Sequence, residues 1–276
     1  MWPADDAYGL SKRLAFCEQI IASRSPALVL DVGCGTGENL TRPLAERFPG
    51  VRFLGIDDDL ESIRHARAGA ALPNLSFGGQ EQLELAPSAG LIIASEVIEH
   101  VESPEAFLSA TGEHLAPDGR LIVTTPNGYG PFELASFIEV LLRASGLFGL
   151  LRAGKRALAG GGGRTRPRDT LAASPHLSFF SYGQILDVFA RSGFEVERYR
   201  PRTLLCGFGF DSLVRAFALG DWNARVADAL SPYWVSDWMF ILKRTSPREL
   251  APYRRGLVTR WRRRLNERCR SRGGTR

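Results

Sequence analysis

Residues 28–37 read LVLDVGCGTG, an apolar run that ends on an acid and is followed by a Gly-x-Gly-x-Gly turn. Such a run is typical of a buried parallel strand whose carboxyl end opens into a glycine-lined crevice before a helix. A side chain at Gly33, Gly35 or Gly37 would block a ligand from the backbone or require an unfavourable φ. The stretch therefore predicts the first strand of an α/β sheet with a ligand-binding turn at its end.

A second candidate strand, residues 51–56, also ends on an acid, Asp57. A carboxylate at this place can accept hydrogen bonds from both hydroxyls of a ribose. The glycine spacing differs from the G-x-G-x-x-G pattern of dinucleotide-binding folds. The two strand ends together predict a nucleoside site, and the alternative is a core strand with an ordinary glycine turn.

The DVGCGTG sequence of residues 31–37, followed by Asp57, resembles motif I and the next acidic position of class I S-adenosylmethionine-dependent methyltransferases. Other segments resemble that family in the same order: SEVIEHV (95–101), LAPDGR (115–120), TPN (125–127), HLSFFS (176–181) and SGF (192–194). Asp118 replaces a usual glycine of the family. The resemblance covers about residues 13–200 and extends to the ubiquinone-pathway O-methyltransferases. It implies an α/β, Rossmann-like sheet of seven strands, mostly parallel with an antiparallel last strand, and helices on both faces.

S-adenosylmethionine is the cofactor that this resemblance implies. The residues expected to bind it are Arg13, Asp31, Gly33, Cys34, Gly35, Gly37, Asp57, Asp58, Gln80, Glu81 and Ser95. Arg13 has the spacing to the first motif glycine of an arginine that contacts the cofactor in the ubiquinone-pathway enzymes; the alternative is a surface arginine. Gln80 or Glu81 could accept a hydrogen bond from the adenine amine, or belong to an ordinary exposed loop.

The chain has 276 residues, 44% of them hydrophobic, which suits one large α/β domain at residues 1–244. Beyond the first two strands, the pattern predicts strands at 75–77, 90–94, 121–125, 194–199 and 237–244, and helices at 6–23, 38–47, 60–68, 182–191, 211–219 and 223–230. Ser11 and Ser181 are expected to cap helices. No secretory signal is visible, and the four cysteines lack C-x-x-C spacing, which predicts a cytoplasmic protein with free thiols.

Glu96, Glu99, His100 and His176 form a candidate metal site. On a helical turn the two glutamates would share a face, and His100 would lie beside the second. Such a set suits Mg²⁺ or Mn²⁺, or Zn²⁺ or Fe²⁺ if both histidines bind. The pattern is similar to that of the metal-dependent RNA 3′-terminal 2′-O-methyltransferases. Alternatively, His100 or His176 acts as a base or lines the pocket without a metal, or these residues are purely structural.

Two insertions, residues 128–174 and 203–236, depart from a minimal domain and are expected to be helical. The first contains an apolar stretch with Glu133, Glu139 and Arg143, whose charges disfavour a membrane span. It is expected to form a lid over the acceptor pocket, or else a packing insertion. Asn127, at the end of strand five, is expected to position the acceptor.

The tail at residues 245–276 is basic. From Arg244 onward there are twelve arginines and two glutamates, a net charge of +10, which leaves −5 for the rest because the chain totals +5. With Trp261, the tail could contact RNA phosphates or an anionic membrane, placing the protein at the membrane periphery. The alternative is a solvated or disordered end outside the fold.

The leading functional hypothesis is O-methylation of a small or lipid-linked acceptor, with His100, His176 and Asn127 as catalytic residues. A metal-dependent RNA 2′-O-methyltransferase is a second hypothesis, and a cofactor-binding protein without turnover is a third.

Overall fold

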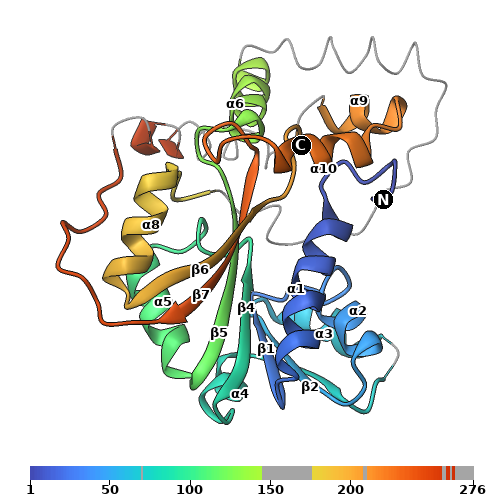
Figure 1. The fold of residues 1–276 in the computed structure, drawn as a ribbon, viewed down its shortest axis with the longest axis vertical. Helices are drawn as coiled ribbons and strands as arrows, with labels where there is room; N and C mark the ends of the chain where they lie inside the picture. Colours follow the sequence, from blue (N-terminus) through green and yellow to red (C-terminus); the bar gives the residue numbers. More distant parts are fainter. Residues whose placement is uncertain (70, 145–175, 208–209, 257–258, 262, 265–276) are drawn as a thin grey trace.

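A seven-stranded sheet in the order β3-β2-β1-β4-β5-β7-β6 forms the centre of this computed structural model (Figure 1). The structure describes residues 1–69, 71–144, 176–207, 210–256, 259–261 and 263–264. The strands are β1 Leu28–Val32, β2 Arg52–Ile56, β3 Leu75–Gly78, β4 Ala89–Ser95, β5 Leu115–Pro126, β6 Phe194–Pro201 and β7 Asp237–Arg244. β1 to β5 pair in parallel, and β7 lies antiparallel between β5 and β6. The predicted fold class is confirmed, including the antiparallel last strand.

Helices cover both faces of this sheet and its carboxyl edge (Figure 1). They are α1 Leu10–Arg24, α2 Thr41–Arg47, α3 Leu60–Ala68, α4 Gln80–Glu84, α5 Pro104–Glu113, α6 Pro131–Ala144, α8 Tyr182–Arg191, α9 Phe210–Ala216 and α10 Gly220–Asp228. Figure 1 shows α1 and α2 on one side of the sheet, α5 and α8 on the other, and α6, α9 and α10 beyond its end. None of the helices in the described ranges is long and apolar enough to cross a bilayer.

The two largest apolar clusters of the described residues lie on opposite faces of the sheet. Phe16 and Ile20 of α1 pack with Ile93 of β4 on one face. Val188 and Phe189 of α8 pack with strand residues such as Ile92 on the other. Because each central strand is buried on both faces, its sequence is continuously apolar and does not alternate.

Two predicted helix starts are wrong. Ser11 does not cap α1; the Asp6 carboxylate does, accepting from the backbone N–H groups of Leu10 at 2.9 Å and Ser11 at 2.8 Å. α2 begins at Thr41 and not at Glu38, because Leu40 still has a non-helical φ of −143°. The prediction for Ser181 is confirmed: its side chain accepts from the backbone N–H of Gln184, and α8 follows.

The second insertion contains α9 and α10, as expected, within its described residues. In the first insertion the structure describes α6. Residues 145–175, which contain several basic residues and the four consecutive glycines 160–163, lie outside the described residues.

The first part of the basic tail packs against the fold, contrary to expectation. Arg191 of α8 donates to the Ala251 carbonyl at 2.7 Å, and the ring of Tyr253 lies 5.0 Å from that of Phe180. Arg255 pairs with Glu102 at 3.0 Å. The sequence did not indicate this contact, because it depends on acids and aromatic rings far away along the chain.

Candidate functional site

The glycine turn after β1 adopts a backbone that other residues rarely take. Gly33, Gly35 and Gly37 have φ values of +77°, +56° and +71°. A Cβ on Gly33 would also lie 2.4 Å from a methyl group of Val97, and one on Gly37 would lie 2.5 Å from the Phe77 ring. Both conformation and close packing therefore require glycine at these two positions.

Asp57 joins the ends of β1 and β2. Its carboxylate accepts from the backbone N–H of Gly35 at 2.8 Å and of Asp59 at 2.9 Å. Each carboxylate oxygen has a second lone pair. Asp57 can thus hold the glycine turn and still accept from ribose hydroxyls, whereas Asp58 beside it is exposed.

Asp31 and Arg13 lie at the opposite side of the turn, where the strand order reverses between β1 and β4. Asp31 accepts from the Thr41 hydroxyl at 2.6 Å, and burial raises its pKa to about 6 despite that bond and the charge of Arg13. Arg13 donates to Ser95 at 3.0 Å, and its Nε is buried without a partner among the described residues. Because a reversal point of this kind opens a crevice in α/β sheets, these residues are well placed to meet the polar end of a ligand.

The remaining predicted cofactor residues lie along the same edge. Cys34 is half-buried within the glycine turn. Gln80 and Glu81 are exposed, but they form the first turn of α4 and not a loop. The structure thus brings the predicted cofactor residues to the carboxyl ends of β1 to β4.

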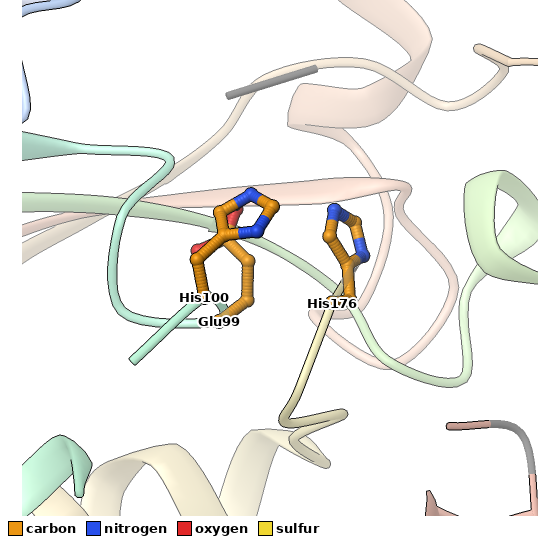
Figure 2. A group of neighbouring side chains, drawn as sticks. All are labelled: Glu99, His100 and His176. Atoms are coloured by element: carbon orange, nitrogen blue, oxygen red, sulfur yellow. The ribbon is translucent and has the colours of Figure 1, made fainter. Parts of the chain in front are cut away.

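Glu99, His100 and His176 gather beyond β4, with ligand atoms within 4.8 Å of one another (Figure 2). The two imidazole centroids are 4.8 Å apart, and Nε2 of His100 lies 3.9 Å from Oε1 of Glu99. Glu99 itself is buried: Oε2 accepts from the Thr125 hydroxyl at 3.1 Å, and Oε1 has no hydrogen-bond partner in the part of the chain that the structure describes. Backbone N–H groups of Leu177 and Ser178 donate to the Glu99 carbonyl, which fixes the His176 segment beside it.

Glu133 of α6 completes this group and was not predicted as a site residue. Its carboxylate lies 2.6 Å from Nδ1 of His176, and it is 3% exposed. The sequence contained a usable signal, since an acid on an otherwise apolar helix face needs a partner when buried. The only consequence predicted from the charge of this acid was that it disfavours a membrane span.

Buried charges shift two pKa values in the group. Burial and the charge of Glu96 raise the pKa of Glu99 to about 8. Burial alone would lower the pKa of His176, but the charge and hydrogen bond of Glu133, together with Glu99 and Glu96, raise it to about 9. A proton is therefore held within this group at neutral pH.

Glu96 does not join the predicted metal set. The segment after β4 is not helical, and Glu96 has a left-handed φ of +59°. Its carboxylate accepts from Thr124 at 2.6 Å and pairs with Arg202 at 3.2 Å. The prediction assumed a helical turn, on which both glutamates would share a face; the actual turn separates them.

Asn127 is occupied by backbone contacts. Its amide nitrogen donates to the carbonyls of Tyr233 at 3.1 Å and Val235 at 2.9 Å, and its oxygen accepts from the Tyr129 N–H at 3.1 Å. It is 2% exposed. Through these contacts Asn127 links the end of β5 to the second insertion. They argue against its predicted role in positioning an acceptor.

Arg202 is a second residue that the sequence did not indicate. It lies buried between Glu96 and Asp237, whose carboxylate it meets at 2.7 Å. Nothing in the local sequence around residue 202 distinguishes it from a surface arginine.

The chain is similar in sequence to known methyltransferases. A family model described as a methyltransferase domain matches residues 4–199. A trans-aconitate 2-methyltransferase of Deinococcus radiodurans is 33% identical over 171 residues, covering 62% of this chain and 60% of that protein. A ubiquinone biosynthesis O-methyltransferase of Caulobacter sp. (strain K31) is 38% identical over 106 residues, covering 36% of this chain and 40% of that protein. The chain thus spans less than two thirds of the length of either relative.

Among solved structures, PKMT2 from Rickettsia typhi has a TM-score of 0.51 with 14% identity, covering 94% of this chain and 55% of that one. At this identity the likeness concerns the fold alone.

Proposed function

We propose that this chain, which belongs to the family of methyltransferase domains and is an S-adenosylmethionine-dependent methyltransferase, methylates a hydroxyl oxygen of a small or lipid-linked acceptor. One observation carries the proposal. The imidazole of His176 lies at the carboxyl edge of the sheet, oriented by Glu133 at 2.6 Å and adjacent to Glu99 and His100.

Methyl transfer from a sulfonium is an in-line displacement. The acceptor oxygen, the methyl carbon and the sulfur must be nearly collinear, and orientation alone can supply several orders of magnitude in rate. In this chain Asp57 and Arg13 would hold the two ends of the cofactor. The new O–C bond forms as the C–S bond breaks, and the thioether product leaves.

The hydroxyl proton must leave as the oxygen attacks. Neutral His176, with Nδ1–H donating to Glu133, has its other ring nitrogen available as a base. Glu133 stabilises the imidazolium that forms. Because unliganded His176 has a pKa of about 9, the base form becomes more populated as the pH rises.

This arrangement favours a hydroxyl over a carboxylate acceptor. A carboxylate acceptor is already ionised at neutral pH, so its methylation does not need a general base. The buried Glu133–His176 pair would then have no function in the reaction. One relative is named for trans-aconitate and another for ubiquinone biosynthesis. The His176–Glu133 pair supports a hydroxyl acceptor, and hence a reaction more like that of the ubiquinone biosynthesis O-methyltransferase.

The same residues fit a divalent cation. Glu99, His100 and His176 supply one carboxylate and two imidazoles, and Glu99 has a buried oxygen without a hydrogen-bond partner among the described residues. Glu133 would orient His176 as carboxylates commonly orient metal-bound histidines. A bound cation would lower the pKa of the acceptor hydroxyl. Among the described residues Glu96 lies outside this set, unlike the prediction.

The test is a panel of acceptors incubated with isotopically labelled S-adenosylmethionine, read by mass spectrometry. It contains phenols with and without a prenyl chain, tricarboxylates and short RNA. O-methylation of a phenol is expected, with turnover in wild type and not in His176→Gln. Methylation of only carboxylates, RNA, nitrogen or carbon would contradict the proposal.

Two further measurements separate the alternatives. Full turnover in excess chelator, with no metal retained by the protein, would exclude the divalent cation. Calorimetric binding of S-adenosylmethionine without any product across the panel would instead support a cofactor-binding protein without turnover.

A further inference from the structure

A cleft of about 600 Å³ lies away from the glycine turn, between the tail and the start of α5. Its walls carry five arginines and two glutamates, a net charge of +3. The arginines are Arg254, Arg255, Arg260, Arg263 and Arg264. A concave surface with this excess of positive charge attracts anions.

The glutamates of the cleft are already paired. Glu102 binds Arg255 at 3.0 Å and Arg263 at 2.9 Å, and Glu105 binds Arg191 of α8 at 3.0 Å. In contrast, Arg254, Arg260 and Arg264 are exposed and form no ion pair with another described residue. Three guanidinium groups therefore face the cleft region without a counter-charge from the described chain.

The tail contacts the two segments that carry His100 and Glu133. Arg255 donates to the carbonyls of Val101 at 3.3 Å and Glu102 at 2.7 Å, directly after His100. Trp261 lies against Phe137 of α6, with ring centroids 5.5 Å apart, one helical turn beyond Glu133. A ligand bound by the arginines would thus lie next to the segment that follows His100, and the tail that holds it also contacts α6, which carries Glu133.

Two apolar side chains are exposed on the tail and on α6, the two elements joined by the Trp261–Phe137 contact. Trp261 is 51% exposed and Leu134 of α6 is 59% exposed. Tryptophan and leucine next to arginine are typical of a protein surface that enters the headgroup region of a bilayer. Nucleic acid would also neutralise the arginines and could stack on Trp261, but it would gain nothing from an exposed aliphatic side chain such as Leu134.

We propose that this arginine cleft binds the phosphate headgroups of an anionic membrane, while Trp261 and Leu134 enter the interface. The arrangement would hold α6 and the catalytic group at the bilayer surface, where a lipid-linked acceptor is found. In that respect the inference rests on the proposed function. The binding itself does not require turnover.

The experiment is co-flotation of the full chain with phosphatidylcholine vesicles, with and without phosphatidylglycerol, in the absence of cofactor and acceptor. Wild type is expected to bind only the anionic vesicles. The R254Q/R260Q/R264Q variant should lose about 100-fold in partition, since each basic residue near an anionic surface contributes a factor of about five. Trp261→Ser should weaken binding by a smaller factor.

A matched control removes the same charge elsewhere: R52Q/R64Q/R198Q replaces three exposed arginines outside the cleft and should bind like wild type. Circular dichroism confirms that each variant is folded. Equal binding to neutral and anionic vesicles, or equal loss in the control variant, would overturn the proposal. The proposal would also be overturned if the wild-type protein bound short RNA or inorganic phosphate but did not bind vesicles. The flotation experiment does not measure methyl transfer. Its result therefore does not depend on whether the proposed reaction occurs.

Discussion

The proposed site has two halves, one for the cofactor and one for the acceptor, and they are built in different ways. In the cofactor half, Gly33 and Gly37 act through backbone conformation, and Asp57 binds backbone N–H groups within a short stretch of chain. In the acceptor half, Glu99, Glu133 and His176 come from three separate segments and act through charge. The comparison teaches that a site built from backbone conformation can be encoded locally, whereas a cluster of buried charges depends on side chains brought together by the fold.

The largest expected effect is on the acceptor half. Glu133→Gln should lower kcat about 10²- to 10³-fold, because general-base catalysis typically contributes this much and the amide cannot stabilise the imidazolium. The affinity for cofactor should be unchanged, which calorimetry with S-adenosylhomocysteine measures. Glu113→Gln, which alters an exposed acid of α5, is the control. Equal losses of kcat and of cofactor affinity would mean that the two halves are not separate.

Asp57→Ala should break the cofactor half. The loss of hydrogen bonds to a charged group costs about 1.5–3 kcal/mol, so the cofactor dissociation constant should rise roughly 10- to 100-fold. Glu61→Ala, at an exposed position in the first turn of α3, should bind normally in the same calorimetric titration. An unchanged affinity in Asp57→Ala would remove Asp57 from the cofactor site.

Dependence on pH should separate the halves without mutation. Asp31, with a pKa of about 6, must be ionised to attract a cationic cofactor, so cofactor affinity should fall as the pH drops through about 6. In the acceptor half, the pKa values of about 8 and about 9 belong to coupled groups, so kcat should rise with pH through that range. In Glu133→Gln the kcat limb should move to lower pH, because the main cause that raises the pKa of His176 is gone.

The variant that tests the fall of cofactor affinity at low pH is Asp31→Asn. It should make cofactor affinity independent of pH near 6. Stability should respond too: since the folded pKa of Asp31 is above its ordinary value, its carboxyl favours folding when protonated, and this contribution is lost as the pH rises through about 6. A single limb common to affinity and kcat would contradict the assignment of two groups.

The smallest catalytic effect is expected at Glu96. Glu96→Gln keeps oxygen and nitrogen near Thr124 and Arg202 but removes a charge-assisted bond, so the free energy of unfolding should fall by about 1–3 kcal/mol. The kcat of the folded enzyme should change less than about threefold. Glu99→Gln is the counterpart and should lower kcat much more. Urea unfolding and steady-state kinetics measure both quantities. A large loss of kcat in Glu96→Gln would support the predicted role of Glu96 in a metal site.

The strand pattern and the glycine turn could be predicted because their causes are local. β7 has the predicted limits, and Gly33 and Asp57 lie where the apolar runs placed them. The helix starts at residues 10 and 41 could not be predicted from the sequence. The first is set by hydrogen bonds to the Asp6 carboxylate, and the second by the path of the backbone after the glycine turn.

The sequence by itself determined an α/β sheet with a glycine turn after its first strand, since burial on two faces and positive φ values restrict which residues can occupy each position. Only the tertiary structure decided that Glu96 belongs with Arg202, that Glu133 belongs with His176, and that the tail forms a basic cleft. The physical reason is that a charge has no preferred partner along the chain. Its pairing is fixed when folding buries it beside whichever opposite charge the packed elements bring within reach.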